Sequence, residues 1–219
     1  MKYLFFILFF LPQIIVSQTI NQIDEKGQKQ GVWKKTFENG NLRYQGFFLD
    51  NLPSGIFYYY YKSGEIQIEK EFFHKGKAAA AHMFYKDGSL QASGLYVDQL
   101  KDSTWNYYNS DSILILSEIY FQGILNGTTK TFYDDGNIYE IKNYKLDTLN
   151  GKWEQFFING NSKMKSSFTN GERQGESVFY YLNGTIYSSG NYLDDNKEGS
   201  WEFYNQDGIL DTLINYTNE

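Results

Sequence analysis

The chain has 219 residues, no cysteine, a formal net charge of −6 and 19% aromatic residues. Without cysteine it can form no disulfide, and it can offer no thiolate as a nucleophile or a metal ligand. Nucleic acids and anionic membranes attract clusters of Lys and Arg, and the sequence contains no such cluster, so the composition argues against both partners.

The first segment, residues 1–17, has the features of a secretory signal peptide. Lys2 provides a positive start, and an apolar run follows it up to Pro12. That run is well short of the roughly 20 residues of a membrane-spanning helix, which is the alternative interpretation. The sequence therefore predicts cleavage between Ser17 and Gln18, and a mature chain that is secreted or held in the periplasm or cell envelope.

A period of 24 residues runs from Gly31 to the end of the chain without insertion or deletion. Steps of 24 from Phe48 always reach an aromatic residue, and steps from Trp33 place all 4 tryptophans in register. A short exact period indicates stacked supersecondary units. The predicted structural ring positions are Trp33, Trp105, Trp153, Trp201, Tyr96, Tyr120, Tyr144, Phe168, Tyr192 and Tyr216.

Each unit has the pattern of a β-hairpin, which is clearest in residues 151–174. A strand around 152–158 is followed by a turn at Asn159–Gly160 and a second strand around 162–169. Asn-Gly and Asp-Gly tolerate the positive φ angles of tight type I′ turns, so we predict such turns here. The turn glycines in register are Gly40, Gly64, Gly88, Gly136, Gly160, Gly184 and Gly208.

These features predict an all-β fold, a single-layer antiparallel β-hairpin repeat array. About eight units of 24 residues, in residues 31–219, give about sixteen short strands in one meandering sheet. Residues 18–30 are expected to form a half-unit that caps the first sheet edge. No stretch shows sustained helical spacing of apolar residues, so almost no helix is expected after the signal peptide.

Several segments resemble the MORN repeat, whose units run Tyr-x-Gly-x-aromatic followed by spaced glycines. They include residues 44–48, 120–127 and 168–175. The Gly-x-Trp openings at 31–33 and 151–153 are similar to the bacterial MORN-repeat variant often labelled the YwqK-family antitoxin component. The resemblance implies an elongated MORN-like β-solenoid that contacts proteins, and the antitoxin label implies a toxic partner held inactive.

One unit, residues 79–102, departs from this pattern. Ala79 and Ala81 replace the opening glycine and the tryptophan. Truncating a buried aromatic side chain commonly costs ~3 to 5 kcal/mol, so this unit is expected to be a weak joint. Repeat drift explains the change, and a hinge or a docking notch is the alternative.

The sequence offers no constellation of catalytic or metal-binding groups. His74 and His82 are the only histidines and have no partner at ligand spacing, and the paired aspartates at 134–135 and 194–195 fall on predicted turns. We therefore predict no catalytic residue, no metal, no cofactor and no enzymatic activity.

The excess of aromatic residues is the remaining indication of function. The periodic rings are expected to pack hairpin against hairpin, whereas rings outside those positions are available for a partner. This favours an exported protein–protein interaction module or scaffold. The alternative is a module that binds cell-wall polysaccharide or peptidoglycan through exposed aromatic rows. The candidate contact residues are Tyr58, Tyr59, Tyr107, Tyr139 and Tyr187.

Overall fold

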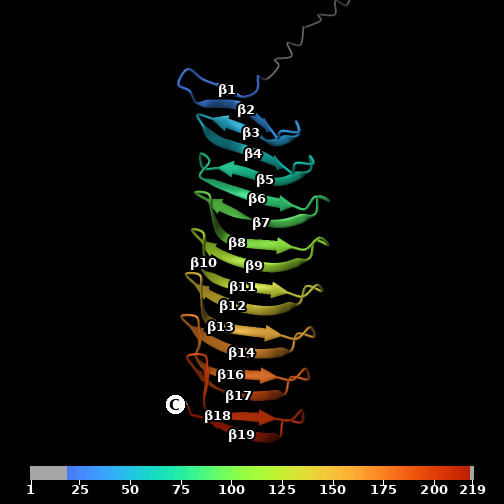
Figure 1. The fold of residues 1–219 in the computed structure, drawn as a ribbon, viewed down its shortest axis with the longest axis vertical. Helices are drawn as coiled ribbons and strands as arrows, with labels where there is room; N and C mark the ends of the chain where they lie inside the picture. The colour runs from blue at the N-terminus through green and yellow to red at the C-terminus, as the bar shows by residue number, and fades with distance from the viewer. Residues whose placement is uncertain (1–18, 218–219) are drawn as a thin grey trace, which may run out of the picture.

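The computed structural model describes residues 19–217 as one open antiparallel sheet, which confirms the predicted fold class (Figure 1). The predicted signal segment lies outside the described residues. The strands are β1 (Gln22–Ile23), β2 (Lys29–Thr36), β3 (Leu42–Leu49), β4 (Leu52–Tyr60), β5 (Ile66–Phe73), β6 (Ala78–Phe84), β7 (Leu90–Val97), β8 (Leu100–Tyr108), β9 (Leu114–Phe121), β10 (Ile124–Leu125), β11 (Gly127–Phe132), β12 (Ile138–Lys145), β13 (Thr148–Phe156), β14 (Ser162–Thr169), β15 (Glu172–Arg173), β16 (Gly175–Tyr180), β17 (Ile186–Leu193), β18 (Asn196–Tyr204) and β19 (Leu210–Tyr216).

The strands follow one another along the long axis of the molecule in chain order, and the described residues contain no helix (Figure 1). There are 19 strands rather than about sixteen. The short strand β1 precedes the first unit. In addition, the backbone N–H groups of Asn126 and Gln174 bond back to Ile119 and Ser167, which divides two strands into β10–β11 and β15–β16.

The prediction of type I′ geometry at the Asn-Gly and Asp-Gly turns is wrong. At Asn159–Gly160 only the glycine has positive φ, at 85°, and the N–H of Phe157 bonds to the carbonyl of Asn161 at 2.8 Å. The ladder shifts register beside this turn, between Gln155 and Phe156. Because a bulge takes up one residue, the loop is longer than two residues and needs only one left-handed position.

Two adjacent left-handed residues occur instead at the connections between hairpins. Asp194 and Asp195 have φ of 49° and 64°, and Asp50 and Asn51 have φ of 51° and 67°. This is the pattern of type I′ turns, which require positive φ at both central residues.

Hydrogen bonds join consecutive units along the two long edges of the sheet, where the strands end and the chain turns. At one edge the Tyr61 hydroxyl donates to the carbonyl of Phe84 at 2.8 Å, and Tyr85, Tyr133 and Tyr181 repeat this bond. At the other edge the Lys29 N–H donates to Asn51 Oδ1 at 2.8 Å. These bonds therefore hold each unit in register with the next at both long edges.

The two faces of the sheet differ in burial. In β14 the side chains of Met164, Ser166 and Phe168 are buried, and those between them are exposed. We call the face of Met164 and Phe168 the ring face, because Trp105 and Trp201 also lie on it with 0% exposure. In a single-layer sheet the core consists of ring-face side chains that cover one another.

Candidate functional site

Large rings on the ring face lie against glycines of the preceding strand. A methyl group on Gly94 would overlap the Trp105 ring, and the same holds for Gly46 with Phe57 and Gly190 with Trp201. Glycine therefore makes room for a ring that lies flat on the backbone, as its use at close approaches leads one to expect.

The register pair of Lys70 and Ala81 reverses this arrangement. Lys70 replaces the glycine, and its register partner Ala81 replaces the ring. Ala81 is only 1% exposed, although its side chain is small. The large side chain now comes from the other member of the pair.

A cavity of about 570 Å³, which we call the notch, lies beside the Lys70 side chain. This volume lies within the usual range of ligand pockets. The notch opens on the ring face across β3 to β7. Its principal lining residues are Phe57, Tyr59, Lys70, Phe72, Lys77 and Tyr96.

The notch is rich in rings and carries positive charge. The Lys70 ammonium lies 4.0 Å from the centroid of the Tyr96 ring, and burial lowers the pKa of Lys70 below its ordinary value of 10.5. Burial also raises the pKa of Tyr96. No aspartate or glutamate lines the notch. It can therefore accept an apolar group that carries negative charge.

The equivalent place in the next unit is filled by the chain itself. Lys101 lies 4.9 Å from the Trp105 ring and donates to the Tyr107 hydroxyl at 2.6 Å. The Tyr120 hydroxyl donates to Glu118 at 2.8 Å. Burial, with a contribution from Glu118, raises the pKa of Tyr107 far above its ordinary value and that of Tyr120 to about 12.

The opposite face of the sheet carries a second feature, a strip of exposed apolar side chains in the N-terminal half. Across the connections, Leu49 pairs with Leu52, Val97 with Leu100, and Phe121 with Ile124. Leu49 is 56% exposed and Phe121 57% exposed. We call the following residues the apolar strip: Phe47, Leu49, Leu52, Ile56, Phe73, Leu100, Ile119, Phe121 and Ile124.

The same positions are mostly polar in the C-terminal half. There Lys145 pairs with Thr148, Thr169 with Glu172, and Leu193 with Asn196. The apolar strip was not predicted, because it follows neither the aromatic series from Phe48 nor the tryptophan series. Steps of 24 from Leu49, which pass through Phe73, Val97 and Phe121 before reaching Lys145, would have found it.

The structure distributes the five candidate contact tyrosines over different surroundings. Tyr59 lines the notch, and the Tyr107 hydroxyl accepts a hydrogen bond from Lys101. Tyr58 is half-buried in β4, and Tyr139 packs edge-on against Tyr133. Tyr187 is 45% exposed. The five tyrosines therefore do not form one surface.

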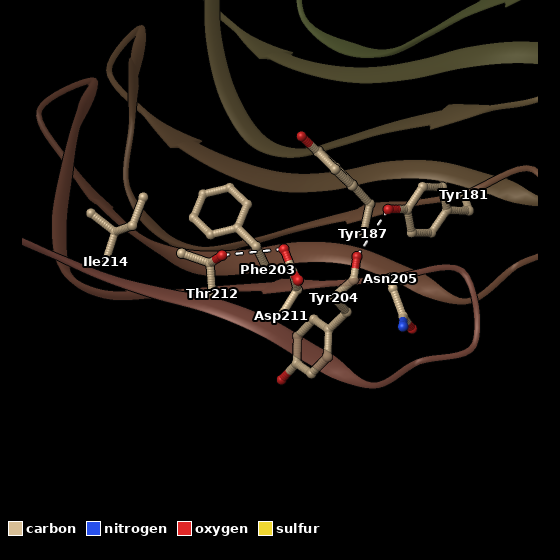
Figure 2. A pocket seen from close by; sticks show the side chains of 8 residues that line it. All are labelled: Tyr181, Tyr187, Phe203, Tyr204, Asn205, Asp211, Thr212 and Ile214. Carbon is tan, nitrogen blue, oxygen red and sulfur yellow. Dashed lines mark hydrogen bonds between the residues drawn. The ribbon is translucent and has the colours of Figure 1, made fainter.

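Tyr187 borders a shallow pocket of about 400 Å³ near the last strands, drawn in Figure 2. The Tyr181 hydroxyl donates to the carbonyl of Tyr204 at 2.9 Å, and Thr212 donates to Asp211 at 3.2 Å (Figure 2). Tyr181 and Tyr187 meet edge to face with centroids 5.2 Å apart. These side chains mainly satisfy one another.

The described residues offer neither a metal-binding cluster nor a membrane-spanning helix. Between residues 19 and 217, no three or more His, Asp or Glu side chains are grouped so that they could hold a metal ion. His74 lies in a turn and His82 on an exposed position of β6. Nor does this part of the chain contain a helix that is long and apolar enough to cross a membrane.

Comparison with known proteins identifies the family. The model of the MORN repeat variant matches residues 29–50, 53–74, 125–146, 173–194 and 197–218, about half of the chain. The longest stretch between matches, 75–124, contains Ala81 and Lys101. Comparison with curated proteins yields no match. The repeat period, the open hairpin sheet and the five family matches together show that the chain belongs to the MORN repeat variant family.

Proposed function

We propose that this chain is an exported, non-enzymatic repeat protein that binds another protein through the apolar strip. The main support for this proposal is the exposure of nine large apolar side chains on one face of the N-terminal half. Extended apolar surface of this kind marks interaction sites in monomeric proteins. MORN repeats are commonly interaction modules, which supports a binding role.

The repeat itself does not require apolar residues in the strip. Asn143 and Lys145 occupy the positions of Ile119 and Phe121 one unit later, in a strand with the same antiparallel pairing. Since polar residues serve there equally well, the apolar residues in the N-terminal half serve contact with something outside the sheet. Elongated repeat arrays commonly provide such binding surfaces.

Export follows from the predicted signal segment, and the absence of enzymatic activity follows from the lack of a predicted catalytic constellation. The antitoxin role that the resemblance implies is one form of this proposal, in which the partner is a toxin. A partner met outside the cytosol fits the predicted export.

Site-specific photo-crosslinking in the native cell tests the proposal. A crosslinking residue at Phe121 should give a discrete protein adduct, and one at Thr169, the matched position in the C-terminal half, should give none. The double substitution Leu49→Lys with Phe121→Lys should remove an adduct formed from Ile56. Equal adducts from both halves would contradict the proposal. So would the absence of any adduct. Binding to insoluble peptidoglycan that survives the double substitution and is lost in Tyr187→Ala would support the glycan alternative instead.

A further inference from the structure

Among the described residues, the Lys77 ammonium group at the rim of the notch has no ring beside it, unlike the lysine at the same position in the next unit. Lys101 lies within 5.1 Å of the centroids of Trp105, Tyr107 and Tyr120. Lys77 holds the same position one unit earlier, where the corresponding residues are Ala81, Met83 and Tyr96. Only one of the three rings remains, and the Lys70 ammonium lies over it.

Lys77 is exposed at the rim of the notch and lacks an anionic partner within the described chain. Its backbone carbonyl accepts the N–H of Asp98, but the Asp98 carboxylate makes no ion pair with it. Lys70 also has no ion pair among the described residues. Two cations therefore border one cavity in a protein whose net charge is −6.

The walls of the notch are flat rings whose faces and edges meet one another. Phe57 packs edge-on against Phe48 and Phe72, with centroids 5.1 and 5.0 Å apart, and is tilted by 28° to Tyr59. Aromatic pairs favour these geometries, so one more ring can join the cluster by the same contacts. The chain itself supplies fewer rings here, because Ala81 and Met83 stand where the next unit has Trp105 and Tyr107.

We propose that the notch binds an aromatic ring that carries a carboxylate, with the ring against Phe57, Tyr59 and Phe72 and the carboxylate beside the ammonium groups of Lys70 and Lys77. The bound ring supplies aromatic contacts of the kind that Trp105 and Trp201 make in their own units. The carboxylate supplies the missing counter-charge. This site lies on the ring face, and Leu52 is the one residue of the apolar strip that also lines it.

The probes are N-acetyl-tryptophan and its uncharged match, N-acetyl-tryptophanamide, followed by calorimetry and by chemical shifts of the full mature chain. We expect a dissociation constant of about 0.1 to 1 mM for the acid, as is usual for a ligand of this size. The amide should bind at least about fivefold more weakly, because it lacks the charged hydrogen bonds. Equal affinity for acid and amide would overturn the proposal, and so would no binding.

Three variants locate the binding. Lys77→Gln should weaken the acid at least about fivefold and leave the fold intact, because Lys77 is exposed. The matched Lys101→Gln should change the affinity less than twofold, since rings already surround Lys101. Lys70→Gly with Ala81→Trp introduces the glycine and ring of the Trp105 and Trp201 units, removes one of the two ammonium groups and should abolish binding. Undiminished binding to a folded Lys70→Gly/Ala81→Trp protein would overturn the proposal, whatever the crosslinking at the apolar strip shows.

A second pair of probes identifies the source of the ring. A peptide capped at both ends with an internal Trp-Asp presents the ring and the carboxylate on neighbouring residues, as a protein segment would. Tighter binding of this peptide than of N-acetyl-tryptophan supports a protein ligand. Tighter binding of N-acetyl-tryptophan supports a free aromatic acid or a carboxy-terminal residue.

Discussion

Ala81 and Trp105 hold the same position in consecutive units, yet a lysine lies beside the alanine and a glycine beside the tryptophan. Trp105 lies flat on Gly94 and is 0% exposed, whereas Ala81 pairs with Lys70, whose side chain lines the notch. The strands around both residues have the same antiparallel pairing. The backbone of the repeat thus accommodates the large side chain on either of the two neighbouring strands.

A third arrangement occurs at Trp153, where both members are large. Its register partner is Lys142, whose ammonium lies 5.1 Å from the ring centroid. The Trp153 indole N–H donates to Glu140 at 2.7 Å, whereas Trp105 and Trp201 donate to backbone carbonyls. At this position the ring beside a long side chain has a polar side chain as its partner. The comparison shows that the ring-face core is built from pairs of neighbouring side chains.

The largest effect is expected from making the Trp105 unit resemble the Ala81 unit. Trp105→Ala should lower the free energy of unfolding by about 3 to 5 kcal/mol, because the ring is fully buried and Gly94 cannot fill the space. Urea denaturation followed by far-UV circular dichroism measures it. The control is Ala81→Gly, with an expected loss of about 1 kcal/mol. Similar losses from the two changes would show that the rings are not the core.

The next largest effect is expected from crowding the Trp105 ring. Gly94→Ala should lower the free energy of unfolding by about 1 to 3 kcal/mol, since the added methyl group overlaps the Trp105 ring. Ser93→Ala, whose side chain points to the other face, should be nearly neutral. The same denaturation measurement compares them. If Gly94→Ala were as mild as Ser93→Ala, the ring would have room that the structure does not show.

Acid should test the Trp153 arrangement. Burial raises the pKa of Glu140, but hydrogen bonds from Lys142, Gln155 and Trp153 outweigh it and hold the pKa below the ordinary 4.5. The carboxylate therefore stabilises the fold fully above that value and loses its contribution as pH falls through the lower folded pKa.

Glu140→Gln should consequently lower the free energy of unfolding by roughly 1.5 kcal/mol near neutral pH. The difference from the unmodified protein should shrink as the pH is lowered below the ordinary value of 4.5. Urea midpoints between neutral and acid pH measure it, with the half-buried Glu154→Gln on the opposite face as control. A difference that stays constant with pH would rule out this role of the charge.

The smallest effect concerns the edge that all units share. Tyr85→Phe removes the bond from the hydroxyl to the Tyr108 carbonyl and should lower the free energy of unfolding by about 0.5 to 1.5 kcal/mol. Amide hydrogen exchange in the following turn should rise. Tyr139→Phe, which leaves the edge bonds in place, is the control. Unchanged exchange beside Tyr108 would show that this bond does not join the units.

Much of the fold was predictable from particular positions in the sequence. The aromatic series from Phe48 and the tryptophan series indicated hairpins stacked by their rings, and the structure has them. The turn geometry was not predictable from Asn159–Gly160, because the dipeptide also suits a longer loop with a bulge. Of the candidate contact residues, Tyr59 lines the notch. Its importance could not be recognised without knowing that Lys70 lies opposite Ala81.

By itself the sequence determined the repeat, its length and its β-hairpin character, because these depend on local turn residues and on spacing along the chain. Only the tertiary structure decided which side chains fill each gap of the ring face. Filling depends on contacts between neighbouring strands, where Lys70 meets Ala81 and Gly94 lies beside Trp105. For the same physical reason, the sequence shows only an alanine at position 81, whereas the structure shows that its partner Lys70 lines a charged, ring-lined notch.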